Sequence, residues 1–337
     1  MRIAIEEIEN QLRTAASKYI SESEASYFAA CTVGAHLRKA PRMNPVQDAV
    51  ADLKVWNDLK GKAVETIVDN ESVMLLDFHG LAPGLKIKEI HDELERRARK
   101  NGIAAAGFHS SSGIITLNMW SYGLAKRDLI GISMFNGGTE CCVPYGGTRG
   151  VLGTNPFAYA IPTAETPMIL DMATTEIPFF EVKQAKEKGL PLSANVAVDR
   201  NGAPTTDARE ALTEDGVANL LPIGGGFKGY GIVMLVEILT SSLVRSLLST
   251  QQTSGWNPTE YGCLMIAIDI GSFTDPVAFK QSVSEMSKTL RSMRPADGFD
   301  GVAIPGDRGH AKAREARERG EIDIADKIIE DLQKLAE

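Results

Sequence analysis

One short segment places an acid and two hydroxyls directly after an apolar run. Residues 168–170 read Met-Ile-Leu, Asp171 follows them, and Thr174 and Thr175 come shortly after. The apolar run predicts a short buried strand, and polar side chains that gather where a strand ends are typical of ligand sites. Capping of the following helix explains Asp171 equally well, because an aspartate oxygen accepts hydrogen bonds from free backbone N–H groups. The residues alone leave both interpretations open.

A histidine and three cations lie close together in a second segment. His36 is followed by Arg38, Lys39 and Arg42 in the run HLRKAPR. Histidine exchanges a proton near neutral pH, and arginine grips a carboxylate with two parallel hydrogen bonds. A solvated surface turn with a structural histidine is the alternative. The combination, on a protein of net charge −8, favours a site that holds an anion and moves a proton.

A glycine pattern opens an apolar helix further along the chain. Gly224, Gly226 and Gly229 form G-x-G-x-x-G. In a Rossmann fold a strand follows soon after the helix and ends on an acid about 20 residues beyond the glycines. Here helix and polar loop run on to about residue 261, so Asp269 comes too late. We therefore predict no Rossmann unit, although Lys228 beside a helix N-terminus is typical of a phosphate site.

Composition restricts the class of protein. The 337 residues are 43% apolar and 24% charged, which is ordinary for a globular protein, and the acidic balance argues against a general nucleic-acid surface. No stretch of about 18 apolar residues exists, and the N-terminal segment lacks a basic start followed by an apolar run. The four cysteines fit neither a zinc nor a disulfide framework. We expect a cytoplasmic protein without a metal site that does not bind nucleic acid or membrane.

The elements that must position these residues alternate between helices and strands. Ser21 and Glu24 form a capping-box pattern at the start of the second helix, which brings His36 near its end. Residues 190–220 are rich in turn residues, and 303–310 are expected to form a loop. The hydrophobic periodicity predicts helices over 5–19, 22–33, 46–56, 85–101, 114–126, 176–189, 232–247, 275–293 and 322–335, and extended segments over 67–78, 103–108, 130–135, 157–161, 168–170 and 261–270.

Several short motifs, in order, resemble those of one family. The chain resembles the type 2 malate/L-lactate dehydrogenases, which include diketogulonate, ureidoglycolate and sulfolactate dehydrogenases and reductases of cyclic imino acids. The motifs cover most of the chain from about residue 130. They are PYGG at 144–147, LGTNP at 152–156, LDMATT at 170–175, GAPTTD at 202–207, LLPIGG and KGYG within 220–231, IAID at 266–269 and IPGDR at 304–308.

The resemblance implies a fold and a reaction. The fold is a non-Rossmann α/β fold, in which a large mixed, mainly antiparallel sheet flanked by helices carries the dinucleotide. A mostly helical domain is expected from residues 1–70 together with 290–337, and the sheet domain from 71–289. The reaction is reversible hydride transfer between NADH or NADPH and a 2-oxo acid, with a cyclic imine such as pyrroline or piperideine carboxylate as the alternative substrate. A homodimer with its active site near the interface is also implied.

The resemblance further implies roles for individual residues. His36 matches the general acid of the family, and Asp171 stands near the cofactor and orients that acid. The substrate-binding candidates are Arg38, Lys39, Arg42, His109, Thr154 and Asn155. The cofactor-binding candidates are Ile169, Leu170, Asp171, Met172, Ala173, Thr174, Thr175, Phe227, Lys228, Gly306, Asp307 and Arg308.

The N-terminal third departs from the family pattern. Ala35 precedes His36 where the family has Ser or Thr, the loop to Pro41 is one residue shorter, and His109 is slightly out of register with a second family histidine. Three cations therefore compete for the substrate carboxylate. A family member that binds the dinucleotide without catalysis is the alternative from another class, and the choice between NADH and NADPH stays open.

Overall fold

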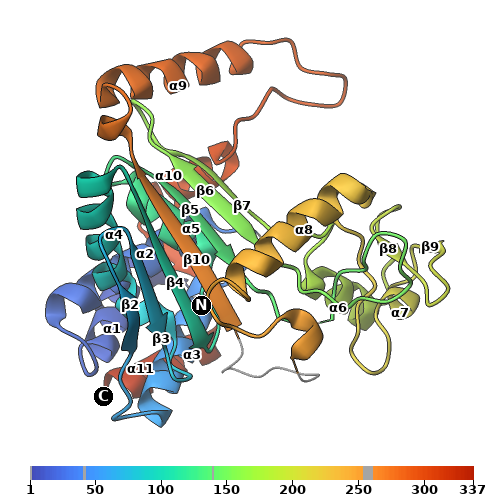
Figure 1. Cartoon of the computed structure of the whole chain (residues 1–337), viewed down its shortest axis with the longest axis horizontal. Coiled ribbons are helices and arrows are strands. Elements are labelled where there is room, and N and C mark those ends of the chain that lie inside the picture. Colours follow the sequence, from blue (N-terminus) through green and yellow to red (C-terminus); the bar gives the residue numbers. More distant parts are fainter. Residues whose placement is uncertain (1, 41–42, 139, 253–260) are drawn as a thin grey trace.

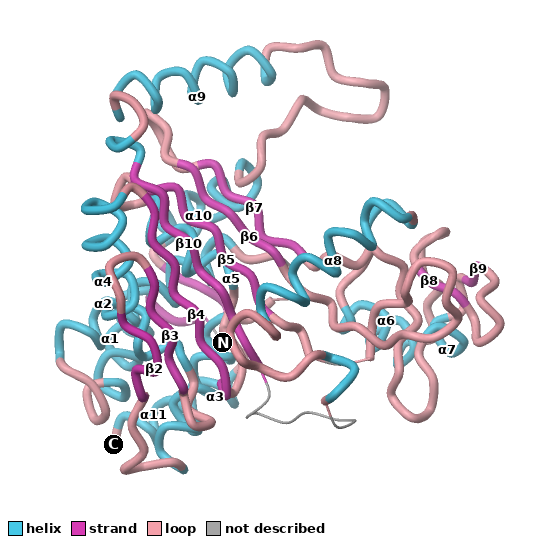
Figure 2. Tube along the Cα trace, in the orientation of Figure 1, coloured by secondary structure: helices cyan, strands magenta, loops and turns pink. Residues whose placement is uncertain are grey.

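The centre of the fold is a seven-stranded mixed sheet. The structure is a computed structural model that describes residues 2–40, 43–138, 140–252 and 261–337 (Figures 1 and 2). The strand order is β2-β3-β4-β10-β5-β6-β7, in which β3 and β4 run parallel and the other neighbouring pairs antiparallel. This confirms the predicted non-Rossmann sheet. The strands are β2 Glu65–Asp69, β3 Val73–Asp77, β4 Ile103–Ser111, β5 Leu129–Phe135, β6 Phe157–Ile161, β7 Met168–Met172 and β10 Tyr261–Asp269.

Helices cover both faces of this sheet because its central strands are apolar on both sides. In β10, Cys263 and Met265 face the main hydrophobic cluster, whereas Leu264 faces a second cluster. The alternation follows from the two-residue period of a strand. On the main-cluster side lie α4 (Ile87–Asn101) and α5 (Leu117–Ala125), and on the other side lies α8 (Phe227–Thr240).

The two ends of the chain meet in one group of helices. β1 (Arg2–Ala4) pairs with β11 (Glu321–Asp323), α1 contacts α2 and α11, and α10 contacts α2. One hydrophobic cluster runs from these helices into the sheet, so the predicted division at residues 70 and 290 is not marked by separate cores and stays a prediction. The helices are α1 Ile5–Ala16, α2 Glu22–Arg38, α3 Pro45–Asp58, α10 Asp307–Arg319 and α11 Asp326–Ala336.

The segment predicted as an irregular excursion forms a small lobe with a core of its own. Val182, Leu212 and Leu220 belong to that core, and α8 runs beside the sheet towards the lobe (Figure 1). The lobe contains α6 Phe179–Lys188, β8 Ala197–Val198, β9 Pro204–Thr205 and α7 Ala208–Ala211. The remaining helices are α9 Pro276–Arg291 and the 3-10 turns Pro83–Lys86, Ile223–Gly225, Ser249–Gln251 and Ile270–Ser272. None of the helices among the described residues is long and apolar enough to cross a membrane.

Several predicted boundaries were wrong, and two of them affect the site. The capping box at Ser21 is confirmed, but α2 continues to Arg38 instead of ending near residue 33. The whole of α10 was missed, since only Ala313 and Ala316 of this charged helix are buried and its apolar stripe is weak. β7 extends to Met172, which places Asp171 inside the strand and not after it.

Candidate active site

Asp171 is held by the start of α5. Its Oδ2 atom accepts hydrogen bonds from Thr116 Oγ1 at 2.7 Å, Asn118 N at 2.9 Å and Asn118 Nδ2 at 3.1 Å. Burial raises the pKa of Asp171, and the three hydrogen bonds oppose that rise. Because all three donors reach Oδ2, the other carboxylate oxygen stays available to the cavity that Asp171 lines. Asp171 lies inside β7 and does not cap the helix that follows it, but by accepting from Asn118 N it satisfies a free N–H group in the first turn of α5.

A cavity of about 370 Å³ lies beside Asp171. The end of α2, the start of α5, β7 and the start of α10 form its walls. Four of its residues are cations and one is an acid, so its field favours an anionic ligand. The residues that line this cavity, here called the Asp171 cavity, are Arg38, Lys39, Ala40, Met43, Asn118, Ile169, Asp171, Gly306, Arg308, Gly309 and Lys312.

Arg38 is fixed by stacking, and it forms no ion pair with any residue that the structure describes. Its Cζ atom lies 3.8 Å from the centroid of the Tyr122 ring, and its Nε atom is enclosed without a partner. Gly34 leaves room for it, since a Cβ there would stand 3.4 Å from Arg38 Nη1. Burial lowers the pKa of Arg38, yet a guanidinium stays charged in proteins. Arg38 as a whole is half-buried, and a partly desolvated charge that has no counter-ion among the described residues suits a residue that awaits an anion.

His36 opens into a different cavity. This neighbouring cavity, of about 350 Å³, shares Lys39 and Lys312 with the Asp171 cavity. The separation follows from helix geometry, because residues two apart, such as His36 and Arg38, point to opposite sides of a helix. His36 is 4% exposed, and its Nδ1 atom is enclosed without a partner. Burial, reinforced by the charge of Lys39, lowers the pKa of His36 to about 4, so the imidazole is neutral at pH 7.

The other predicted substrate residues do not line the Asp171 cavity. Asn155 is fully buried, and its Nδ2 donates to Glu237 Oε2 at 2.7 Å, which ties the turn before β6 to α8. Thr154 neighbours it in the same turn, and a Cβ on Gly137 would stand 2.6 Å from Thr154 Oγ1. His109 lies in β4 and contacts Ser110 Oγ through Nδ1 at 2.9 Å. Arg42 lies outside the described residues.

The structure brings the three predicted cofactor segments together along the edge strand β7. At the start of β7, Ile169 N donates to Pro305 O at 3.1 Å, which places residues 306–308 beside it. Beyond its end, Ile223 N donates to Thr174 O at 2.9 Å, which places the 3-10 turn Ile223–Gly225 beside that end, with residues 227–228 following at the start of α8. Residues 169–175, 227–228 and 306–308 therefore form one continuous border.

The residues of this border fit an extended dinucleotide. Gly306 has φ 103°, and a Cβ on it would stand 2.7 Å from Ile169 Cγ2, so only glycine allows the loop so close. Gly224 and Gly225 also have positive φ, and a Cβ on either would meet nothing within 4 Å. The N-terminus of α8 is thus open, with exposed Lys228 beside it. Free N–H groups and a cation at a helix N-terminus suit a pyrophosphate.

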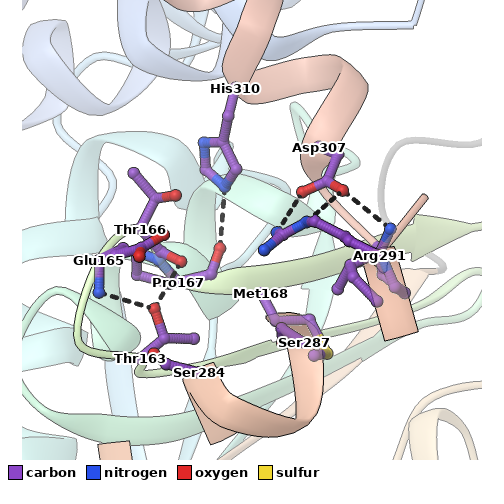
Figure 3. Close-up of a pocket in the computed structure, with 12 residues that line it drawn as sticks. Thr163, Glu165, Thr166, Pro167, Met168, Ser284, Ser287, Arg291, Asp307 and His310 are labelled. Carbon is purple, nitrogen blue, oxygen red and sulfur yellow. Dashed lines mark hydrogen bonds and ion pairs between the residues drawn. The ribbon is translucent and has the colours of Figure 1, made fainter. Parts of the chain in front are cut away.

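Some polar side chains of these segments serve the fold instead. Thr174 Oγ1 donates to Asn155 O at 3.0 Å, and Thr175 Oγ1 donates to Ile177 O at 2.8 Å. Asp307 binds Arg291 through two hydrogen bonds of 2.6 and 3.0 Å. Figure 3 shows this pair, which ties the start of α10 to the end of α9, and the contact of His310 Nε2 with Pro167 O at 2.8 Å, which anchors α10 on the turn before β7.

Sequence reasoning missed four residues of the site. Thr116 and Asn118 hold Asp171, Tyr122 holds Arg38, and Lys312 faces both cavities. Two polar residues at the start of an apolar helix were a usable signal for the first pair. No feature of the sequence singled out Tyr122 or Lys312, because an aromatic residue in an apolar helix and a lysine in a charged helix are both ordinary.

Comparison with known proteins gives relatives that cover most of the chain. It is 34% identical to a malate/(S)-sulfolactate dehydrogenase of Methanothermus fervidus, in an alignment that covers 81% of this chain and 78% of the relative. It is 32% identical to an NAD(+) ureidoglycolate dehydrogenase of Escherichia coli O157:H7, over 70% of this chain and 67% of the relative. It is 29% identical to an NADP(+) (2R)-3-sulfolactate dehydrogenase of Chromohalobacter salexigens, over 75% of this chain and 74% of the relative.

Two solved structures and one family model extend the likeness to the whole chain. Sulfolactate dehydrogenase from Methanocaldococcus jannaschii matches with a TM-score of 0.84 at 24% identity, covering 99% of this chain and 96% of that one, which shows the fold. Delta1-piperideine-2-carboxylate reductase from Pseudomonas syringae matches with a TM-score of 0.79 at 26% identity, covering 99% of each. The model of the malate/L-lactate dehydrogenase family matches residues 3–333, and the chain therefore belongs to that family.

Proposed function

We propose that this protein reduces a 2-oxo acid to the 2-hydroxy acid, reversibly, at the expense of NADH or NADPH. Its family makes it an oxidoreductase, and its relatives are named for NAD(+) and NADP(+). The observation that carries the proposal is the cationic cavity that joins Asp171 to the border of β7. When bound there, the nicotinamide supplies a hydride to the carbonyl carbon.

The chain's own residues bind and orient the substrate. Arg38 offers a guanidinium that has no counter-ion among the described residues, and a 2-oxo acid's carboxylate fits its two parallel N–H donors. The stack on Tyr122 holds that guanidinium in place before the substrate arrives. The Asp171 carboxylate is fixed by α5, and its free oxygen can accept a hydrogen bond from the hydroxyl of the 2-hydroxy acid. Both groups are thus positioned in advance, which is how enzymes gain from proximity.

The excess of positive charge indicates the substrate class within the 2-oxo acids. One cation suffices for a single carboxylate, whereas Lys39, Arg308 and Lys312 line the same cavity. A second anionic group on the substrate would meet this charge, and the relative from Methanothermus fervidus is named for two such dianions, malate and sulfolactate. We therefore propose that the enzyme prefers dianionic 2-oxo acids to pyruvate as substrates.

The origin of the proton is a separate question. A donor must come within about 2.6–3.2 Å of the carbonyl oxygen, directly or through one water. The family resemblance assigns this role to His36, and the assignment stays a prediction. Its neutral imidazole opens into the neighbouring cavity, with Lys39 and Lys312 shared between the two.

A cyclic imine is the second candidate substrate. It is favoured by the likeness to the piperideine carboxylate reductase, which spans nearly the whole of both chains. The same cavity suits an imine that carries one carboxylate, because reduction of C=N needs the same hydride and a proton on nitrogen. The excess of cations distinguishes the two candidates, since a monoanionic imine leaves most of that charge unused.

The proposed assembly is a homodimer. Ile232, Leu235 and Ile238 are 43%, 55% and 48% exposed and share one face of α8. An apolar stripe of this kind supports burial against a second copy of the chain. Light scattering on the purified protein measures the mass directly, and a monomer at micromolar concentration contradicts the proposal.

The reduced nicotinamide band, followed with NADH and NADPH in parallel, tests the proposed reaction. The substrate panel contains oxaloacetate and sulfopyruvate as dianions, pyruvate as a monoanion, and pyrroline and piperideine carboxylates as imines. We expect the highest kcat/KM with a dianion, and loss of that preference in Arg308→Gln or Lys312→Gln. Turnover of the imines alone promotes the second candidate, and no turnover across the panel favours a member that binds the dinucleotide without catalysis.

A further inference from the structure

The first turn of α10 lies between β7 and the end of α2. A Cβ on Gly306 would stand 2.7 Å from Ile169 Cγ2, and a Cβ on Gly309 would stand 2.9 Å from Arg38 O. Glycine at both positions therefore lets this turn pack closely against the cofactor border on one side and against the substrate-binding cation on the other. The next residue, His310, carries the side chain that joins the two sides.

The imidazole of His310 is held in one orientation. Its Nε2 atom lies 2.8 Å from Pro167 O, in the turn before β7 (Figure 3). A carbonyl oxygen only accepts hydrogen bonds, so Nε2 carries the hydrogen of this contact. Burial lowers the pKa of His310, and the bond to Pro167 O opposes that shift without cancelling it. The ring is therefore neutral at pH 7, in a single tautomer that its bond to the backbone fixes.

The ring of His310 packs against the ring on which Arg38 stacks. The centroids of His310 and Tyr122 are 5.9 Å apart, with the two planes inclined by 44°. Arg38 Cζ lies 3.8 Å from the centroid of the same tyrosine. A cation is attracted to the face of an aromatic ring and not to its edge, so the plane of Tyr122 decides where the guanidinium lies. The other contacts of Tyr122 are with an apolar cluster of Ala125, Ala160 and Ile169.

His310 does not itself reach the place where the substrate is expected. Neither His310 nor Tyr122 is among the described residues that line the Asp171 cavity. His310 borders a separate small cavity beside Arg291 and Asp307 (Figure 3). An effect of His310 on the substrate must therefore pass through Tyr122 to Arg38.

From these contacts we propose that His310 is a positioning residue, which holds the plane of Tyr122 and thereby fixes the guanidinium of Arg38 for the substrate carboxylate. The inference rests on the proposed reductase function and adds a residue to its substrate site. The transfer of hydride and proton is left unchanged. Arg38 binds the carboxylate in the ground state and in the transition state alike, so loss of its positioning raises KM and leaves kcat in place.

Two substitutions divide the contacts of His310. His310→Gln keeps an N–H group that can donate to Pro167 O but removes the ring, whereas His310→Phe keeps a ring against Tyr122 and removes the donor. In His310→Gln we expect KM for the preferred 2-oxo acid to rise about 10-fold, the order of a lost cation–π contact, with kcat within about twofold. The rise in His310→Phe should be smaller. Arg314→Gln, one turn further along α10 and exposed, is the control and should keep the KM of wild type.

The dinucleotide separates positioning from a general loosening of α10. Gly306 and Arg308 lie in the same turn, so a distorted turn raises KM for the dinucleotide as well, whereas we expect that KM to stay within about twofold in His310→Gln. In an Arg38→Gln background, His310→Gln should lower kcat/KM no further, because it acts through the missing guanidinium. A parallel rise of both KM values, additive effects of the two substitutions, or a wild-type KM in His310→Gln overturns the role of His310.

Direct binding distinguishes a failure of this role from a failure of the proposed function. Calorimetry with oxamate, an unreactive 2-oxo acid analogue, and enzyme saturated with the reduced dinucleotide gives an affinity without turnover. We expect His310→Gln to weaken oxamate about 10-fold. Wild type that shows this difference but reduces no 2-oxo acid refutes the proposed function and supports the role of His310. Wild type that reduces a 2-oxo acid, while His310→Gln binds oxamate equally well, refutes the role of His310 alone.

Discussion

The two sides of the Asp171 cavity are built in opposite ways. On the α5 side, Asp171 is surrounded by donors, and its hydrogen bonds are supplied by Thr116 and Asn118. On the side of α2, Nε of Arg38 in this cavity and Nδ1 of His36 in the neighbouring one are enclosed without a partner among the described residues. On the α5 side, Oδ1 of Asn118 is the matching exception among the described residues that line the cavity.

This difference separates residues that stabilise the fold from residues that await a ligand. A satisfied polar network favours the folded state, whereas each unpaired buried polar group costs about 1–3 kcal/mol. Such groups persist mainly where a ligand or a reaction needs them. We therefore expect substitutions on the α5 side to lower both stability and activity. On the α2 side, activity should fall while stability is kept or gained.

The largest effect is expected for Asp171→Ala. The substitution removes the acceptor of Thr116 Oγ1–H and of Asn118 N–H, while Asn118 Nδ2 keeps its bond to Thr116 Oγ1 at 3.0 Å. It also removes the acid that balances four cations. We expect kcat/KM to fall by about 10³-fold and the free energy of unfolding by about 2–4 kcal/mol. Steady-state kinetics and urea denaturation measure the two effects. Thr116→Val, which removes one donor, should show a smaller loss of both, and an Asp171→Ala protein of unchanged stability contradicts the contrast.

Arg38→Gln is the counterpart on the other side. We expect KM for a 2-oxo acid to rise by about 10²-fold, because a charge-assisted pair to the substrate carboxylate is lost. Stability should stay the same or increase, because an enclosed unpaired charge is removed. Tyr122→Phe keeps the ring that Arg38 stacks on and should retain KM, whereas Tyr122→Leu should raise it. A clear loss of stability in Arg38→Gln would show that the guanidinium has a structural partner.

From the sequence, the residues along the border of β7 could be recognised more readily than the residues of α5 that hold Asp171. The motifs at 152–156, 170–175, 220–231 and 304–308 carry local backbone features, such as glycines at positive φ, that a short pattern can specify. Their assembly along one strand edge followed from strand pairing. The partners of Asp171 lie 53 and 55 residues earlier in the chain. No local pattern connects residues that meet only through packing.

The placement of His36 depended on where one helix ends. The sequence predicted a helix that runs to about residue 33 and brings His36 near its end, with Arg38 in the loop that follows, so it did not fix the direction of Arg38 relative to His36. The helix in fact reaches Arg38, and a rotation of about 100° per residue turns the two side chains apart. The continuation depends on packing against α10, which contacts α2, and α10 itself was not predicted. One missed helix therefore changed the interpretation of the site.

The smallest predicted effect concerns Asp48, which faces Lys39 from α3. Burial raises the pKa of Asp48 to about 7, and the charge of Lys39 opposes the rise. Because the folded pKa lies above the ordinary value of an aspartate, the folded state holds a proton that the unfolded chain releases between about pH 4 and 7. The contribution of this group to stability is full below about pH 4 and is lost as pH rises through 7.

Asp48→Asn removes this dependence, because the amide stays neutral at every pH. We expect the free energy of unfolding to become flatter between pH 4 and 7 and to increase at pH 8 by about 1–2 kcal/mol, less than the shift alone implies because the side chain is only half-buried. Urea denaturation across this range measures it, with Asp58→Asn at the end of α3 as an exposed control. If Asp48→Asn instead loses stability at pH 8, the carboxylate is ionised in the folded protein and pairs with Lys39. The lysine would then be held as a fixed cation by a protein carboxylate, and the contrast between the two sides would rest on Arg38 and His36 alone.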